Sequence, residues 1–367
     1  MKVAFFIGGL NRGGTETLLL DVFSKKEYAP FEMILIYRNE GNLSKEFRTT
    51  GVPMFRLKPQ GGKMKYFLEL RKLLKSEKVD ILHAQTPTNA LIGIVCTLFT
   101  KTKLVFTFHG LFTSSNMWFK RHMAMWFSKE VIFVSKYVMD WYSSHSLLFP
   151  RNSSNVVYNG INFDKINVIY PEPGFFKEYE SDKCVRLAMV GNFMRGRSHI
   201  VVCKSLKLLC DKGIRNFHFY FVGRRVEEEA KLFDACVNYC EANELMDYVH
   251  FVGSRGDVPA ILQHIDGFVY STVDDTFGIA VVEAVSAGLP VVVNDWVVMR
   301  EILEGQSLVE FFETGNIEDC CGKIEALIND DEIRKKDEAS EANIIKEKYS
   351  IEKHICSLNN VYSKVVS

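Results

Sequence analysis

Residues 275–293 constrain the fold more than any other part of this sequence. Apolar side chains at residues 277–285 recur at helical spacing, and Gly288 followed by Pro290 is typical of a helix end. The β-branched run at residues 291–293 is typical of a buried strand. A helix that leads through a short turn into a buried strand is part of a βαβ unit. The sequence therefore predicts an α/β fold.

The start of this predicted helix also carries candidate chemistry. Asp274 and Asp275 occupy the positions expected for an N-cap and a first-turn acid. Gly278 lies near the first turn, where unpaired N–H groups suit a phosphate. Asp275 and Glu283 lie a little over two helical turns apart, so we expect both to face one side. The alternative is an ordinary amphipathic helix with two surface acids.

Length and composition indicate a soluble protein of two domains. A chain of 367 residues is too long for one ordinary core, and 47% apolar with 25% charged residues is typical of globular proteins. The nine cysteines show no ligand spacing, which favours a reducing compartment. The apolar start ends at Gly8, too early for a signal peptide, and no run reaches the about 18 apolar residues of a membrane span. We therefore expect a cytoplasmic location.

The net charge of zero hides an uneven distribution. Residues 1–170 hold 23 Lys and Arg against 12 Asp and Glu, a charge of +11, and the remaining 22 and 33 give −11. A basic half favours an anionic partner, such as an anionic membrane surface or a lipid-diphosphate acceptor. Nucleic acid would suit the charge, but no nucleic-acid motif is present, so we expect none. A chance asymmetry of solvated faces is the alternative.

A glycine-rich segment follows the first predicted strand, residues 3–7. The loop ends in Gly13, Gly14, Thr15 and Glu16, and a helix is predicted from Thr17. Strand, glycine loop and helix start form a phosphate-cradling arrangement, and glycine lets the backbone approach a ligand closely. The spacing is not G-x-G-x-x-G, which argues against a nicotinamide site. A plain tight turn is the alternative.

Two histidines lie in predicted strands of the first half. The buried strand predicted at residues 103–110 ends in His109 and Gly110. Ligands of open α/β sheets bind at the carboxyl ends of strands, so we favour a functional role for His109 over a core histidine. His83 is either structural or lines an acceptor cleft. The aromatic and basic residues 118–127 predict a helix that either packs in the first domain or lies on a bilayer.

The second half repeats the alternation of strands and helices. Residues 170–182 are rich in Pro, Gly and acid and are predicted to form a linker. After the strand at residues 186–191 comes a loop with Asn192, Arg195 and Arg197. A long helix is predicted at residues 226–243. No internal sequence repeat was found.

These motifs, in this order, resemble those of the retaining GT-B glycosyltransferases of family 4. The matches are the Gly-Gly-Thr-Glu loop at 13–16, His109-Gly110, the loop at 191–199, and Asp275 with Phe277-Gly278 and Glu283-Ala284. The resemblance implies two Rossmann-like βαβ domains facing across a cleft. Residues 1–170 would form the acceptor side and 171–345 the donor side. Residues 346–367 would form a C-terminal helix that packs back on the first domain.

The resemblance also implies roles for individual residues. Glu283 would hold the ribose, Asp275 the transferred sugar, and the backbone around Gly253 the base. Asn192 stands where the family has Arg, and Arg197 where it has Lys. The implied catalytic residues are His109, Arg197 and Asp275. The implied donor-binding residues are Gly13, Gly14, Asn192, Gly253, Phe277, Gly278, Ile279, Ala280 and Glu283. Thr15 and Glu16 would lie on the acceptor side.

The activity implied is transfer of a hexose or N-acetylhexosamine from a nucleotide-diphosphate sugar, with UDP favoured. The anomeric configuration would be retained, and the acceptor would be a glycan or lipid-linked saccharide of bacterial surface polysaccharide synthesis. No metal and no cofactor are expected. Work at the inner face of the plasma membrane fits the basic half. One alternative is a weak or inactive nucleotide-binding subunit of a glycosyltransferase complex. A nucleotide-sugar epimerase and a structural nucleotide-binding protein are the others.

Overall fold

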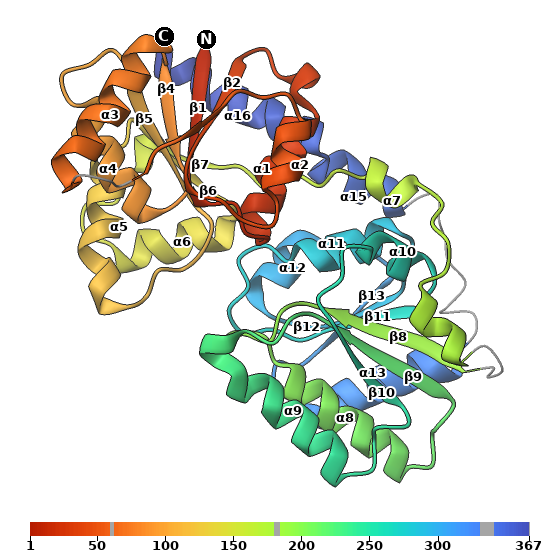
Figure 1. Ribbon diagram of the computed structural model, residues 1–367. Coiled ribbons are helices and arrows are strands. Elements are labelled where there is room, and N and C mark those ends of the chain that lie inside the picture. The colour runs from red at the N-terminus through yellow and green to blue at the C-terminus, as the bar shows by residue number, and fades with distance from the viewer. Residues whose placement is uncertain (59–61, 180–183, 331–340, 367) are drawn as a thin grey trace. The chain divides into compact units, whose positions relative to one another are not determined.

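The computed structural model describes residues 1–58, 62–179, 184–330 and 341–366. It divides into two compact units, residues 1–161 with 349–367 and residues 162–348 (Figure 1). The first boundary thus falls before the predicted one at residue 170, and the second falls after the predicted one at residue 345. Each unit is an α/β domain built on one parallel sheet.

The first unit contains a parallel sheet of strand order β3-β2-β1-β4-β5-β6-β7. Its strands are β1 (Lys2–Gly9), β2 (Glu32–Asn39), β3 (Met54–Arg56), β4 (Ile81–Ala84), β5 (Lys103–Phe108), β6 (Glu130–Phe133) and β7 (Ser154–Val156). Its helices are α1 (Gly14–Ser24), α2 (Ser44–Thr49), α3 (Gly62–Ser76), α4 (Pro87–Thr97), α5 (Ser115–Phe127), α6 (Lys136–His145) and α16 (Ile351–Val366).

Side chains on the two faces of this sheet enter two separate cores, because successive strand residues point to opposite faces. Val3 and Phe5 of β1 pack with α1, α2 and α16, whereas Ala4 and Phe6 pack with α3, α4, α5 and α6. Such strands, buried on both faces, are near-continuous apolar runs.

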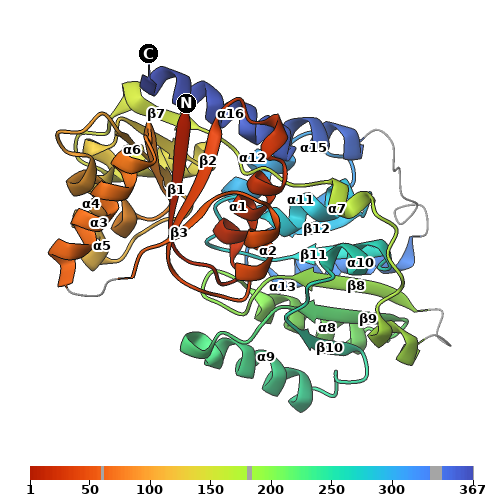
Figure 2. The same ribbon diagram turned by 45° about the horizontal axis from the view of Figure 1, so that its top comes forward.

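The C-terminal helix belongs to the first unit, as predicted. Figure 2 shows α16 beside β1 and β2 of the first unit. In α16, Ile355, Leu358 and Tyr362 are buried in a core that also holds residues of β1, β2 and α1. His354 Nδ1 lies 2.7 Å from the Tyr158 carbonyl oxygen. The chain therefore returns to its first unit to complete that unit's core.

The second unit contains a parallel sheet of order β10-β9-β8-β11-β12-β13. Its strands are β8 (Val185–Val190), β9 (Phe217–Val222), β10 (Val249–Gly253), β11 (Gly267–Tyr270), β12 (Val291–Asn294) and β13 (Val309–Phe312). Its helices are α7 (Asp164–Asn167), α8 (His199–Asp211), α9 (Ala230–Ala242), α10 (Val258–Gln263), α11 (Ile279–Ser286), α12 (Val297–Leu303) and α13 (Ile317–Asn329), with α15 (Glu341–Tyr349) at the boundary.

Two predicted segments of the second half differ in the structure. The linker prediction at residues 170–182 is wrong over residues 174–179, which form a 3₁₀ helix whose Phe176 is fully buried against Tyr220. Residues 180–182 lie outside the described part. The helix predicted from residue 226 begins later, at Ala230, after a 3₁₀ turn of three glutamates.

Candidate active site

Each sheet has a point where its strand order reverses, and ligands of open α/β sheets bind at the carboxyl ends of the strands there. In the second unit this point lies between β8 and β11. The loop after β8 carries Asn192 and Arg197, and the segment after β11 carries Asp275 and Gly278. The topology thus brings four predicted site residues to one edge of the sheet.

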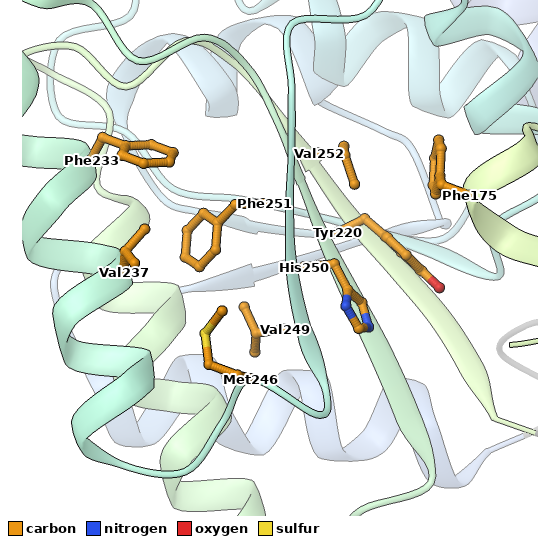
Figure 3. A pocket seen from close by; sticks show the side chains of 9 residues that line it. All are labelled: Phe175, Tyr220, Phe233, Val237, Met246, Val249, His250, Phe251 and Val252. Carbon is orange, nitrogen blue, oxygen red and sulfur yellow. The ribbon is translucent and has the colours of Figure 1, made fainter. Parts of the chain in front are cut away.

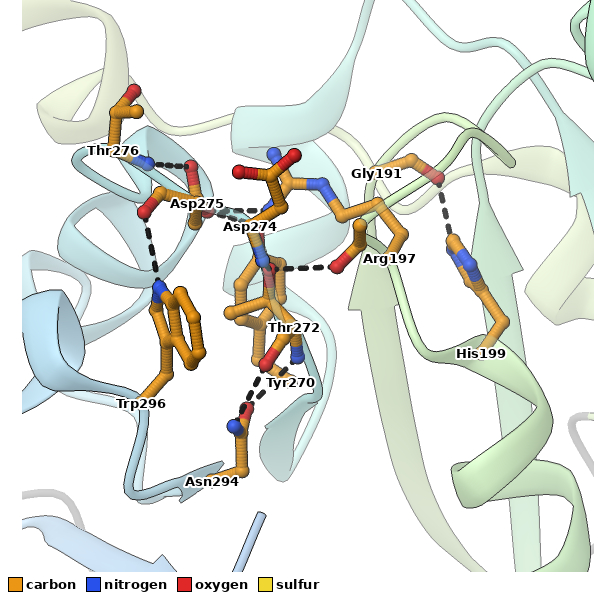
Figure 4. Close-up of polar contacts among 11 residues, drawn as sticks. Gly191, Arg197, His199, Tyr270, Thr272, Asp274, Asp275, Thr276, Asn294 and Trp296 are labelled. Carbon is orange, nitrogen blue, oxygen red and sulfur yellow. Dashed lines mark hydrogen bonds and ion pairs between the residues drawn. The ribbon is translucent and has the colours of Figure 1, made fainter. Parts of the chain in front are cut away.

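Arg197 and Asp275 form an ion pair at this edge (Figure 4). The contact joins Arg197 Nη1 to Asp275 Oδ2, and Tyr270 Oη donates to the same carboxylate oxygen over 2.7 Å. The guanidinium also lies over the Tyr270 ring, 5.0 Å from its centroid. Asp275 Oδ1 accepts from the Thr276 N–H at 2.9 Å. Both charges are held in fixed positions by at least two contacts.

The backbone around this pair is held by hydrogen bonds between the two loops. Arg197 forms an antiparallel bridge with Thr272, whose hydroxyl donates to the Gly196 carbonyl at 2.9 Å. Asn294, fully buried at the end of β12, accepts from the Thr272 N–H and donates to its carbonyl, each at 2.8 Å. Sequence reasoning missed Asn294 and Tyr270. A polar residue directly after a buried strand was the available signal.

The start of α11 differs from the prediction. The helix begins at Ile279, and its N-cap is Gly278 with a left-handed φ of 82°, so the expected N-cap role of Asp274 and first-turn role of Asp275 are wrong. Asp275 binds Arg197 instead. Residues 275–278 form a turn that precedes the helix. Ile279 and Ala280 stand in the first helical turn, where backbone N–H groups have no partner within the helix. This leaves donors for an anion beside the Arg197–Asp275 pair.

Asn192 has a structural contact of its own. Its side-chain oxygen accepts from the Arg224 N–H at 3.1 Å, which joins the loop after β8 to the loop after β9. Nearby His199 stacks on Phe193 with ring centroids 4.0 Å apart, and burial lowers the His199 pKa to about 3. Burial raises the pKa of Asp274 above its usual value. Asn192 thus shapes the loop that carries Arg197.

Gly253 ends β10 with a left-handed φ of 71°, and its carbonyl accepts from the Gly223 N–H at 2.9 Å. A hollow of about 430 Å³ flanks the same strand (Figure 3). Its walls are mainly aromatic and aliphatic, with Phe175 and Tyr220 on one side and Phe233 and Phe251 on the other. None of the predicted donor residues lines it.

In the first unit, Gly13 is the N-cap of α1 and the helix begins at Gly14. The expectation that helix starts only at Thr17 is therefore wrong, and Gly14, Thr15 and Glu16 form the first turn. The Glu16 carboxylate folds over Gly13, where an added Cβ would lie 2.6 Å from Oε2. Burial raises the pKa of Glu16 above its usual value. A side chain at position 13 would therefore require the Glu16 carboxylate to move.

His109 follows β5 and lies beside the end of β4. Its Nε2 is 2.7 Å from Gln85 Oε1, and burial lowers its pKa to about 3. Gln85 Nε2 donates to the His83 carbonyl at 3.4 Å, which fixes the amide orientation. His109 is therefore a neutral ring near pH 7 whose Nε2–H donates to Gln85, which places the lone pair on Nδ1.

His83 is a structural residue. It is 2% exposed, and its ring nitrogens lie 2.7 Å from Tyr362 Oη and 2.7 Å from Thr107 Oγ1. It therefore joins β4 to α16 and β5, which settles the alternative that the sequence left open.

Among residues 1–58, 62–179, 184–330 and 341–366, no group of three or more His, Cys, Asp or Glu is placed to hold a metal ion. Within the same ranges, no helix has the length and hydropathy to cross a membrane.

Two Rossmann-like domains, each built on one parallel sheet, are the architecture of the GT-B fold. The fold is that of a Rickettsia africae glycosyltransferase (TM-score 0.85, 17% identity, covering 100% of this chain and 98% of that one). It is equally that of Anabaena Alr3699/HepE in complex with UDP and glucose (TM-score 0.85, 17% identity, 99% of both chains).

Family models narrow this class further. The model described as "Glycosyltransferase Family 4" matches residues 12–165, and "Glycosyl transferases group 1" matches residues 184–330. Together they cover most of the chain, which therefore belongs to the family-4, group 1 glycosyltransferases and is an enzyme of that kind.

Curated relatives are bacterial glycosyltransferases. One is the N,N'-diacetylbacillosaminyl-diphospho-undecaprenol alpha-1,3-N-acetylgalactosaminyltransferase of Campylobacter jejuni, 25% identical over 78% of this chain and 80% of that protein. Another is the Escherichia coli UDP-Gal:alpha-D-GlcNAc-diphosphoundecaprenol alpha-1,3-galactosyltransferase, 25% identical over 63% of this chain and 62% of that protein.

Proposed function

We propose that this enzyme transfers a hexosyl or N-acetylhexosaminyl group from a nucleotide-diphosphate sugar, with UDP favoured, to a glycan or lipid-linked saccharide, with retention of configuration. The observation that carries the proposal is the Arg197–Asp275 pair held beside the first turn of α11. A cation and helix N–H groups together suit a diphosphate. The UDP and lipid-diphosphate names of the relatives support the substrate classes.

The donor would bind with its diphosphate against Arg197 and the N–H groups of Gly278, Ile279 and Ala280. Glu283, one turn further along α11, would accept hydrogen bonds from the ribose hydroxyls. Gly253 would shape the part of the donor site that holds the base, and Asn192 the part that holds the phosphates. Phe277 would support the turn that precedes α11. Because Arg197 and this helix turn supply positive charge, the proposal requires no metal ion and no cofactor.

In the proposed reaction the bond from the anomeric carbon to the leaving diphosphate breaks, and the acceptor oxygen bonds to the same face of that carbon. The acceptor's proton goes to the departing phosphate oxygen. Arg197 would stabilise the charge that develops on that oxygen, which lowers the barrier. Asp275 would bind the transferred sugar. Neutral His109 would hydrogen-bond the transferred sugar, and its low pKa argues against general-acid catalysis by this residue near pH 7.

The acceptor would bind on the first unit, near Gly13, Gly14, Thr15 and Glu16.

We also propose that this unit contacts the inner face of an anionic membrane. One face of α5 packs inward, with Ala124 and Met125 fully buried, whereas Phe119 and Phe127 are 59% and 57% exposed. Exposed aromatics on a basic domain suit a membrane interface. The inward face of α5 thus packs in the first domain, and the proposal assigns its exposed aromatic face to the bilayer.

Donor binding tests the proposal. Thermal unfolding with UDP, GDP, ADP and CMP, with and without magnesium, should show a midpoint raised by UDP alone and unchanged by magnesium. We expect Glu283→Ala to abolish that shift, and Glu241→Ala on an exposed face of α9 to retain it. A retained shift in Glu283→Ala would refute the ribose assignment.

The alternative is a weak or inactive subunit, and the Asn192 contact favours it, because a residue that joins two loops has replaced a phosphate-binding arginine. Turnover of UDP-sugar by the isolated chain with a lipid-linked acceptor separates the two. Nucleotide binding without any turnover, in the presence of several acceptors, would favour the subunit.

A further inference from the structure

A cavity of about 600 Å³ lies in the first unit between α3 and α4, outside the site described above. Its walls are largely apolar, with Phe67 from α3 and Leu91, Ile92 and Val95 from α4. Its size is within the about 300–1,000 Å³ typical of small-molecule sites. The cavity therefore has room for the head-proximal part of an amphiphile.

Two buried polar atoms of this cavity have no partner in the described part of the chain, Arg38 Nε and Tyr66 Oη. Tyr66 is 4% exposed, and burial raises its pKa to about 12, an effect that the nearby Arg38 charge opposes. A buried donor left unpaired costs free energy. Two such donors beside one cavity indicate an acceptor group of a ligand, and the guanidinium makes an anion the best match.

The position of Arg38 connects the cavity to the proposed acceptor side. Arg38 lies at the end of β2, and its Nη2 donates to Asn89, which is fully buried and donates to the Phe6 carbonyl of β1. An added Cβ on Gly8 would lie 3.2 Å from Arg38 Nη2. Arg38 therefore lies against the end of β1, which leads into the Gly13 loop.

Exposed apolar side chains lie on the same two helices that line the cavity. Val95 lines the cavity and is 50% exposed, and α3 exposes Met64 and Leu68, which lie on one helical face. Lys63 supplies a further positive charge among the lining residues. The cavity thus has an anion-binding end beside β1 and an apolar wall that continues to the surface.

We propose that this cavity binds the phosphate-bearing end of a polyprenyl-linked acceptor. Arg38 Nε and Tyr66 Oη would donate to phosphate oxygens, and the first isoprene units would lie between α3 and α4. The sugar on that phosphate would then extend past Gly8 toward the Gly13 loop. The inference rests on the proposed function for the nature of the acceptor, but the site itself can be tested without the donor.

Binding of farnesyl diphosphate, followed by calorimetry, is the first test. The wild-type chain should bind it at least about tenfold more tightly than inorganic diphosphate or farnesol, because only farnesyl diphosphate fills both ends of the cavity. Tyr66→Phe removes a hydroxyl that has no described partner, so it should fold normally and lose about fivefold in affinity. Equal affinity for farnesyl diphosphate and inorganic diphosphate would overturn the proposal.

A matched pair of variants tests the apolar wall. Val95→Trp should fill the cavity and abolish binding, whereas Leu98→Trp, which is similarly exposed but outside the lining, should bind as the wild type does. Equal binding by both variants would refute the location. If the thermal midpoint shows that Val95→Trp is unfolded, the affinity of Tyr66→Phe alone tests the location of the site.

Vesicles distinguish the lipid source. Phosphatidylglycerol vesicles should not displace farnesyl diphosphate, and full displacement would show a general anionic-lipid site and overturn the polyprenyl assignment. Farnesyl diphosphate binding is measured without nucleotide, so its result does not depend on the donor site. Farnesyl diphosphate binding without any nucleotide binding would retain this inference and reject the proposed function, whereas the reverse result would reject the inference alone.

Discussion

Arg197 forms an ion pair with Asp275 and is also the cation that we propose faces the donor phosphate. Its ion pair with Asp275 and its position over Tyr270 fix the guanidinium before any donor arrives. A preorganised cation does not need to reorient as charge develops on the leaving group. The lysine of the family pattern is here an arginine, whose planar fork can keep one carboxylate contact and still face a phosphate.

We expect Arg197→Ala to lower kcat about 100- to 1,000-fold while changing the donor Kd much less, since the charge matters most in the transition state. Single-turnover rates at saturating donor, beside donor affinity by calorimetry, provide the measurement. Arg215→Ala, an exposed arginine of the same unit, is the control. A loss confined to donor affinity would contradict the assigned role.

At the scale of elements, the start of α11 decides whether the helix can face an anion. Gly278 has φ 82°, and an added Cβ would lie 2.7 Å from Met299 Cε. Any other residue at position 278 would therefore add backbone strain and would require the Met299 side chain to shift.

Gly278→Ala should cost more stability than the about 1–2 kcal/mol of left-handed backbone strain, because the Met299 contact adds to it. Gly305→Ala is a matched control, since Gly305 has φ 80° and no atom within 4 Å of its added Cβ. Urea unfolding of both variants measures the difference. Equal losses would show that the Met299 contact contributes nothing.

The C-terminal helix is the second element with a testable role. Leu358 is 2% exposed in the core that α16 shares with β1, β2 and α1. Leu358→Ala should destabilise the first unit by about 3 kcal/mol through the cavity it leaves. The control is Cys356→Ala, because Cys356 is exposed on the same helix. Urea unfolding followed by tryptophan fluorescence measures both, and a loss below that of the control would exclude α16 from the core.

For the whole molecule, buried histidines set the response to acid. Burial lowers the pKa of His109 and His199 to about 3 and of His250 and His354 to about 4. The unfolded chain has histidines near pKa 6.5. Above pH 6.5 these histidines are neutral in both the folded and the unfolded chain. Below it only the unfolded state binds protons, so stability is lost as the pH falls from about 6.5 toward about 4.

We therefore expect the urea midpoint to fall steadily between pH 6.5 and pH 4. His354→Gln should reduce the slope by about one proton, because it removes one titrating group. Midpoints measured at half-unit intervals check both statements. A flat profile in the wild type, or an unchanged slope in the variant, would contradict the buried neutral state.

The sequence alone determined the fold class, the family, several of the strands and helices, and the C-terminal helix of the first unit. These follow from local periodicity, from glycine and proline positions, and from ordered motifs that neighbouring residues carry. The same motifs placed His109 at a strand end, Arg197 in the loop after a strand, and Asp275 in the first turn of a helix that in fact begins at Ile279. The roles of these residues with substrate remain predictions.

Only the tertiary structure decided how side chains far apart in the sequence pair. It joined Asp275 to Arg197 rather than to the N-terminus of α11, and Asn192 to the Arg224 backbone. It assigned His83 to the core through Tyr362, 279 residues away. It also revealed that Arg38 Nε and Tyr66 Oη, both beside one cavity, have no hydrogen-bond partner in the described part of the chain. Such pairings depend on which strands lie side by side, and the spacing of residues along a chain does not encode that by itself.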